Sequence, residues 1–156
     1  MSETEEMISL AEAIEIVEQE LAGISLPVET IPIAHALGRT VIKDQVSSLD
    51  IPPFDKSAMD GYAVLDGDQR EEYCLLETIP AGAVPTMQLT PGTCTKVMTG
   101  APVPHCAGRV IMVEHTSQSE QIVRVLSHSD VRNICRKAED VRCGDIVLHA
   151  GTELGA

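Results

Sequence analysis

Short strand-like runs separated by turn residues fill the middle of the chain. Five runs contain Val, Ile, Thr or Tyr at high density: residues 61–65, 73–79, 93–98, 109–114 and 121–126. The segments between them, such as 66–68, 80–82 and 90–92, hold Gly, Pro and Asp, which permit or preset turn dihedrals. Runs of this length and composition are typical of β-strands. We therefore expect a β-rich module over residues 51–132.

A helix is predicted before this region. Ser9 and Glu12 have the spacing of a capping box, in which each side chain binds the other residue's backbone N–H. Apolar residues then recur at three- and four-residue steps up to the stop signal at Gly23: Leu10, Ala13, Ile14, Val17 and Leu21. This periodicity predicts one amphipathic surface helix.

The remaining signals are short and lie on both sides of the β-rich middle. Residues 34–37 suggest one helical turn ended by Gly38, and residues 40–46 suggest a short strand. Residues 146–148 suggest another strand with turns at both ends. We expect an α+β, β-rich fold in which residues 1–50 and 133–156 form an elongated module of helix and strands, with residues 51–132 inserted between them.

Charge and aromatic content exclude one class of partner. The net charge is -13, with 11 basic against 24 acidic residues, and the chain has one Phe, two Tyr and no Trp. Nucleic-acid binding needs basic surfaces, and single strands also need aromatic stacking platforms. Nucleic acid is therefore not an expected partner. A local basic cluster of Arg132, Arg136, Lys137 and Arg142 leaves an anionic small molecule as a candidate ligand.

Cysteine usage and hydropathy predict where the protein resides. The five cysteines are odd in number and widely spaced, without the two-residue spacing of zinc or redox motifs. No stretch approaches the roughly 20 apolar residues of a membrane span. We expect reduced thiols, a cytoplasmic location and no membrane contact. A metal sensor built from His105, Cys106, His115 and Cys135 is disfavoured, because their spacing is irregular.

The first dense group of chemically capable residues lies just before the run at residues 61–65. Pro52 and Pro53 stiffen the approach, and Asp60-Gly61 places a carboxylate on a tight turn ahead of the strand. Such a carboxylate can bind hydrated magnesium, orient a water or accept a ligand hydrogen bond. The alternative is purely structural, with Asp60-Gly61 a simple turn and Pro52–Phe54 a packed loop.

The second group covers residues 97–104, where a strand runs into a loop of Gly and Pro. Thr99 is expected at the end of the strand, where its hydroxyl and free N–H groups of Gly100 and Ala101 would meet a phosphate or an oxyanion. An ordinary strand terminus explains the same pattern.

Together these segments resemble a known family, the molybdopterin molybdenumtransferases of the MoeA type and the related domain of gephyrin. The resemblance rests on Pro52-Pro53-Phe54-Asp55-Lys56-Ser57-Ala58-Met59-Asp60-Gly61-Tyr62-Ala63, followed later by Met98-Thr99-Gly100-Ala101-Pro102-Val103-Pro104. Residues 133–140 are similar to the family's Asn-Ile-Arg-x-x-Gly-Glu-Asp segment. Three positions depart from the usual residues: Lys56 replaces Asn, Cys135 replaces Arg and Ala138 replaces Gly.

The resemblance implies an activity and a set of site residues. The family inserts molybdenum from molybdate into adenylylated molybdopterin with Mg²⁺ and releases AMP. By motif, Asp60 and Thr99 would be catalytic, with Asp60 also contacting the metal through a magnesium-bound water. Lys56, Ser57 and Gly100 would contact the substrate. The implied partners are the pterin substrate, a second copy in a homodimer, and the molybdopterin adenylyltransferase.

Two interpretations of the chain follow. In the first it is the N-terminal portion of the enzyme, inactive alone, because the family's α/β pterin-binding domain and C-terminal β-barrel have no counterpart in this sequence. In the second it is a non-catalytic scaffold or dimerisation module, in which Asp60 and Thr99 only hold loops in shape. Turn stabilisation is the alternative role for Asp55 and Ser57.

Overall fold

A computed structural model describes residues 8–155 and divides the chain into two compact units, Met1–Ile42 with Gly151–Ala156, and Lys43–Ala150. The first seven residues of the predicted N-terminal module and Ala156 lie outside the described part. Over residues 8–155 the secondary structure is β-rich with one α-helix, which confirms the predicted α+β class. The predicted module boundaries at residues 50/51 and 132/133 stay a prediction.

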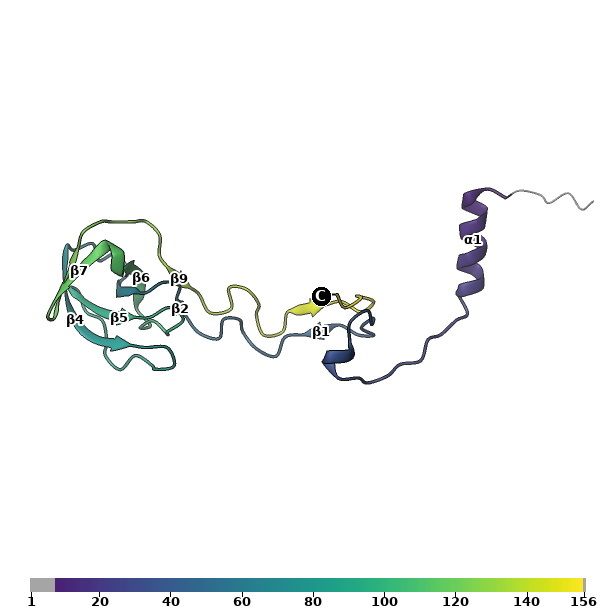
Figure 1. Ribbon diagram of the computed structural model, residues 1–156, viewed down its shortest axis with the longest axis horizontal. Coiled ribbons are helices and arrows are strands. Elements are labelled where there is room, and N and C mark those ends of the chain that lie inside the picture. Colours follow the sequence, from purple (N-terminus) through teal and green to yellow (C-terminus); the bar gives the residue numbers. More distant parts are fainter. Residues whose placement is uncertain (1–7, 156) are drawn as a thin grey trace, which may run out of the picture. The chain divides into compact units, whose positions relative to one another are not determined.

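Helix α1 spans Leu10–Leu21 (Figure 1) and begins as the sequence predicts. The Ser9 hydroxyl accepts the Glu12 N–H at 3.2 Å, and Glu12 Oε2 accepts the Ser9 N–H at 2.8 Å. These two bonds satisfy backbone donors that a helix start leaves unpaired. No residue of α1 is buried, so it is a surface helix. Within residues 8–155 no helix has the length and apolar content needed to cross a membrane.

The rest of the smaller unit is held by backbone pairing. The predicted helical turn at residues 34–37 is the 3-10 helix η1, Ile33–His35, and Gly38 has a φ of 73° after it. The predicted strand at residues 40–46 is wrong in extent. Only Gln45–Val46 forms a strand, and Thr40 makes an isolated bridge with Glu153. Backbone hydrogen bonds also join Val41 to Thr152 and Arg39 to Leu154, so this segment pairs at separate points and not as one continuous strand.

A six-stranded sheet forms the body of the larger unit (Figure 1). Its order is β6 (Ala107–Met112), β3 (Gly61–Leu65), β5 (Thr93–Val97), β4 (Glu72–Ile79), β8 (Ile122–Val125) and β7 (Thr116–Ser119). All neighbours are antiparallel except β4 and β5. The five predicted runs therefore correspond to β3, β4, β5, β6 and β8, whereas β7 was not expected from the sequence.

Hydrophobic side chains pack in two clusters on the sheet. Ala63, Val97 and Val110 belong to one cluster, while Tyr62 and Ile111, their neighbours in sequence, belong to the other. This alternation follows from the two-residue period of strands. At Gly61 an added Cβ would collide with the Ile111 carbonyl and the Val110 side chain, so β3 and β6 can approach closely only because this residue is glycine.

The segment that leads into the sheet pairs with the segment that leaves it through two short β-ladders. β2 (Lys56–Ser57) pairs with β9 (Ile134–Cys135), and β1 (Gln45–Val46) pairs with β10 (Ile146–Leu148). The predicted strand at residues 146–148 is thus confirmed as β10. An isolated bridge between Ile51 and Val141 lies between these ladders.

Candidate functional site

Three segments that are distant in sequence meet around β2. The Ser57 N–H donates to the Ala101 carbonyl at 2.9 Å, and the Gly100 N–H donates to the Ser57 carbonyl at 2.8 Å. On the other side, the Ala58 N–H donates to the Asn133 carbonyl at 2.9 Å. The segments that carry the sequence motifs near residues 57, 100 and 133 are therefore adjacent in the folded chain.

Asp60 and Thr99 are joined directly. Asp60 Oδ1 accepts hydrogen bonds from the Thr99 N–H and the Thr99 hydroxyl, each at 2.7 Å. The sheet produces this contact, because Asp60 immediately precedes β3, Thr99 closely follows β5, and Gly61 of β3 lies opposite Val97 of β5. The two residues that sequence reasoning placed in the site therefore lie together.

The electrostatics of Asp60 favour the carboxylate form. The backbone and hydroxyl hydrogen bonds from Thr99 lower the pKa of Asp60 below its usual value, and the charge of Lys96 acts in the same direction. Both Asp60 and Thr99 are exposed. Asp60 Oδ2 has no hydrogen-bond partner among residues 8–155, so this oxygen is available to a water or a ligand.

The predicted free N–H groups of the 99–101 loop are not free. The Gly100 N–H is used by Ser57, the Ala101 N–H donates to the Met98 carbonyl at 2.9 Å, and both Thr99 donors point to Asp60. The expectation that Gly100 and Ala101 offer unpaired donors to a phosphate is therefore wrong. These N–H groups are bound within the protein because folding leaves few backbone donors without a hydrogen-bond acceptor.

Ser57 and Lys56 lie on β2, next to this pair of segments. Ser57 is only 1% exposed, and its hydroxyl donates to the Met59 carbonyl at 2.6 Å, which favours a loop-stabilising role. The backbone of Lys56 lies opposite Cys135 on one side and Pro102 on the other. Direct substrate contacts by Lys56, Ser57 and Gly100 stay predictions.

The basic residues near position 136 are mostly neutralised. Asp55 binds the Arg136 guanidinium at 2.6 Å and the Lys137 N–H at 2.7 Å. Lys137 Nζ also lies 3.1 Å from Asp50 Oδ2. Arg132 lies within ion-pair distance of Asp66. The basic cluster therefore mainly ties its own segment to the carboxylates of residues 50–66 and does not form an unpaired basic patch.

Lys96 is a neighbour of the site that the sequence did not indicate. Its Nζ lies 5.6 Å from the centroid of the Tyr62 ring and 3.4 Å from Gln118 Oε1. The Tyr62 hydroxyl donates to the same Gln118 oxygen at 2.8 Å. Only the pairing register of β3 and β5, which sets Tyr62 opposite Lys96, brings these groups together. Sequence spacing alone does not reveal such a register.

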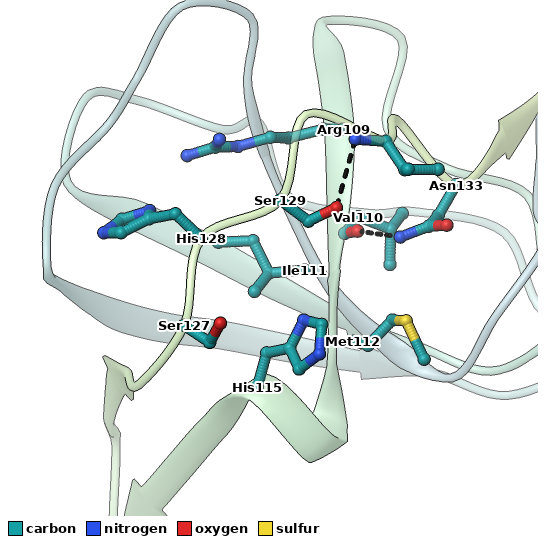
Figure 2. A pocket seen from close by; sticks show the side chains of 10 residues that line it. Arg109, Val110, Ile111, Met112, His115, Ser127, His128, Ser129 and Asn133 are labelled. Carbon is teal, nitrogen blue, oxygen red and sulfur yellow. Dashed lines mark hydrogen bonds between the residues drawn. The ribbon is translucent and has the colours of Figure 1, made fainter.

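A separate small cavity lies beside edge strand β6 (Figure 2). Its walls include Arg109, Ile111, Met112, His115, His128 and Asn133, and its volume of about 10 Å³ holds about one water molecule. The Asn133 side-chain amide donates to the Val110 carbonyl at 3.0 Å, as Figure 2 shows. Neither Asp60 nor Thr99 lines this cavity, so it is distinct from the candidate site.

Comparison with known proteins identifies the family of the chain. Residues 8–156 match the family model described as the MoeA N-terminal region, domains I and II. The chain belongs to this family. Among curated relatives, it is 33% identical over 134 residues to a molybdopterin molybdenumtransferase of Staphylococcus epidermidis, a match covering 81% of this chain and 32% of the relative. It is 38% identical over 130 residues to molybdopterin molybdenumtransferase 2 of Mycobacterium tuberculosis, covering 78% and 32%.

Solved structures of MoeA proteins have the same fold. A molybdopterin biosynthesis MoeA protein from Pyrococcus horikoshii OT3 superposes with a TM-score of 0.73 and 39% identity, over 81% of this chain and 35% of that one. A second structure of that type gives a TM-score of 0.71 and 28% identity, over 96% and 40%. The chain spans about one third of the length of the curated MoeA-type relatives that it matches.

Proposed function

We propose that the chain contributes the Asp60–Thr99 part of an active site that inserts molybdenum from molybdate into adenylylated molybdopterin and releases AMP. Membership of the MoeA N-terminal region family supports this assignment. The observation that carries it is the double hydrogen bond from Thr99 to one oxygen of Asp60. An exposed carboxylate whose orientation is fixed in this way, with its second oxygen available, is suited to bind or orient a reacting group.

In this proposal the two residues have different tasks. Thr99 holds the carboxylate plane, because both of its donors bind Oδ1. Asp60 uses Oδ2 to accept a hydrogen bond from a water or from the substrate. The lowered pKa of Asp60, due to the hydrogen bonds from Thr99, keeps this oxygen an acceptor at neutral pH.

The proposal includes a magnesium ion, for which Asp60 is the candidate ligand among the described residues. Within residues 8–155 no three His, Cys, Asp or Glu side chains are grouped as metal ligands. A single carboxylate still fits the usual magnesium environment, in which waters and substrate phosphates provide most ligands. Asp60 would contact such an ion directly or through a bound water. When bound, magnesium neutralises charge on the phosphoanhydride.

We further propose that Lys56 and Gly100 line the approach of the substrate, while the buried Ser57 supports them through its carbonyl, which accepts the Gly100 N–H. Gly100 has a φ of 82°, and an added Cβ there would meet nothing within 4 Å, so a ligand can come close to this backbone. Lys56 would add positive charge for an anionic pterin. Since the relatives are about three times as long, the other substrate contacts would come from outside these residues, and residues 1–156 alone would be inactive.

The exposed face of α1 supports a second copy as partner. Leu10, Ile14, Val17 and Leu21 are between 50% and 78% exposed, although they form the apolar stripe of the helix. A lone 12-residue helix is marginal in water unless this stripe is covered. We propose a homodimer, in which Ile14→Asp would lower the mass measured by sedimentation to that of one chain. An unchanged dimer mass would refute the role of α1.

The same exposed stripe favours the second candidate function, a scaffold or dimerisation module without a catalytic part. Contact with the molybdopterin adenylyltransferase, a pterin ligand and a cytoplasmic location are further elements of the enzyme proposal. The two candidates differ in one respect, because only the enzyme needs the Asp60 carboxylate for turnover.

The deciding experiment is Asp60→Ala in the complete protein, with Asp130→Ala, an exposed carboxylate outside the site, as the matched control. We expect AMP release coupled to molybdenum insertion to fall at least about 100-fold in Asp60→Ala. The control should keep the parent rate. Turnover near the parent rate in a folded Asp60→Ala protein would remove the catalytic proposal and leave the scaffold.

A further inference from the structure

We propose that Lys96 is the anion-binding residue of this site and holds a phosphate group of the substrate beside the Asp60–Thr99 pair. The inference rests on the proposed function and assigns one of its substrate contacts. Lys96 would thereby add to the attraction for anionic substrate that is proposed for Lys56. The support comes from the position of Lys96 and from its positive charge, which no carboxylate neutralises. It also comes from the neighbouring N–H donors, which are already bound within the protein, and from the contacts of Lys96 with Tyr62 and Gln118.

Lys96 is placed at the site by the strand register. It lies on β5 opposite Tyr62, which is two residues from Asp60, and it precedes Thr99, which follows the end of β5, by three residues. Its ammonium group lies over the Tyr62 ring, 5.6 Å from the centroid. The charge of Lys96 also helps to lower the pKa of Asp60, which places the ammonium group near the pair. Its backbone is held in the sheet by the pairing of β3 with β5.

The charge of Lys96 is available to a ligand. Among residues 8–155, no carboxylate lies within 4.0 Å of its Nζ, whereas Arg136 and Lys137 are each bound to an aspartate. An ammonium group has three N–H donors. One reaches Gln118 Oε1 at 3.4 Å, so two remain for an anion.

Lys56 likewise has no ion pair among residues 8–155, but Lys96 is the lysine whose charge acts on Asp60. The remaining donors of the site do not have this freedom. The N–H groups of Thr99, Gly100 and Ala101 are all used within the protein, as is the Thr99 hydroxyl. A phosphate that approaches Asp60 would meet carboxylate repulsion unless a cation lies nearby. Lys96 supplies that cation.

Tyr62 and Gln118 hold the ammonium group before any ligand binds. The Tyr62 hydroxyl donates to Gln118 Oε1 at 2.8 Å and thereby orients this oxygen toward Lys96. The ring face adds a cation–π attraction. A lysine held in this way loses less side-chain freedom on binding than an unrestrained one, which favours a phosphate over bulk water as its partner. Gln118 is thus a positioning residue for Lys96.

The test is AMP binding to the complete protein, measured by titration calorimetry without magnesium. Lys96→Met removes the charge and keeps an apolar stem against Tyr62, whereas Lys96→Arg keeps the charge. We expect the AMP dissociation constant to rise about tenfold or more in Lys96→Met and to change less than about threefold in Lys96→Arg. Lys43→Met, which removes an exposed lysine elsewhere, should bind AMP as the parent does.

Adenosine provides the matched ligand, because it lacks the phosphate. Its affinity should be the same for the parent and Lys96→Met. Equal AMP affinity in the two proteins, or an equal loss for AMP and adenosine, would overturn the proposal, as would a parent protein that does not bind AMP. If Lys96→Met does not fold, Gln118→Leu must still weaken AMP binding about threefold, and no change would overturn the proposal.

Failure of the anion site and failure of the catalytic proposal give different results. If Asp60→Ala keeps full turnover while Lys96→Met loses AMP affinity, the catalytic role of Asp60 fails and the anion site stands. If Asp60→Ala loses turnover while Lys96→Met binds AMP normally, the catalytic role stands and the anion site fails.

Discussion

Oδ1 of Asp60 accepts two hydrogen bonds from Thr99, one from the backbone N–H and one from the hydroxyl, both at 2.7 Å. The residues are 39 positions apart and are joined because β3 and β5 pair directly next to them. The arrangement uses all donors of Thr99 and leaves the second oxygen of Asp60 exposed. Thr99 therefore fixes the orientation of the Asp60 carboxylate and has no donor left for a ligand.

Thr99→Val should raise the pKa of Asp60. The substitution removes the hydroxyl donor and keeps the backbone N–H, so the carboxylate loses one of the two bonds that lower its pKa. A side-chain carboxyl ¹³C NMR titration of the full chain measures the change. Thr78→Val, at an exposed position on β4, is the control and should leave the Asp60 titration where it is in the parent. An unchanged Asp60 titration in Thr99→Val would contradict the role of the hydroxyl.

Asp55→Asn should make the free energy of unfolding less dependent on pH in the acidic range. Burial alone would raise the pKa of Asp55, but hydrogen bonds from the Lys137 N–H and the Arg136 guanidinium outweigh it, and the pKa lies below 3.8. A lowered folded-state pKa stabilises the fold above the unfolded-state value, and this contribution is lost as pH falls through the folded-state value. Urea unfolding of parent and variant should therefore differ by a constant amount near pH 7 and begin to converge as pH falls below the unfolded-state pKa of about 3.9. Parallel curves over that range would count against the Asp55 contacts.

How much the sequence predicts depends on whether a signal is local. The capping box at Ser9 was predictable because both partners lie within one turn, and strands β3, β4, β5 and β8 were predictable from their density of Val, Ile, Thr and Tyr. Strand β7, Thr116–Ser119, has no apolar residue and lies at the sheet edge, so no hydrophobic pattern marks it.

Contacts that depend on register were beyond the sequence. The motifs indicated Asp60 and Thr99 separately. They did not indicate that the N–H and the hydroxyl of Thr99 both donate to Asp60. The pairing of Tyr62 with Lys96 follows from how β3 and β5 are aligned, and no spacing within either strand encodes it. The parallel pairing of β4 with β5 is likewise a property of the assembled sheet.

Thr95→Val should stabilise the protein. Thr95 is fully buried on β5, and its hydroxyl oxygen has no hydrogen-bond partner among the described residues. Replacing the hydroxyl with a methyl group keeps the shape and removes the desolvation cost, which raises the free energy of unfolding by about 1 kcal/mol. Chemical denaturation tests this, with Thr78→Val expected to change little. A destabilised Thr95→Val would show that the hydroxyl is satisfied in solution.

Ala138→Gly should also stabilise the protein. Ala138 has a φ of 59°, a left-handed conformation that costs a residue with a Cβ about 1 to 2 kcal/mol. Glycine removes this strain but adds freedom to the unfolded chain, so a net gain of about 0.5 kcal/mol is expected. Ala81→Gly, an exposed loop alanine without a positive φ, is the control and should lose stability. Equal losses in both variants would contradict the strain at residue 138.

In the proposed enzyme, Asp60 and Thr99 act as one catalytic unit. A double-mutant cycle on molybdenum insertion in the complete protein measures this coupling, with Asp60→Ala, Thr99→Ala and the double variant compared at saturating substrate. Because Thr99 is proposed to act through Asp60, the double variant should be no slower than Asp60→Ala alone. Rate losses that multiply in the double variant, or single variants near the parent rate, would contradict the claim.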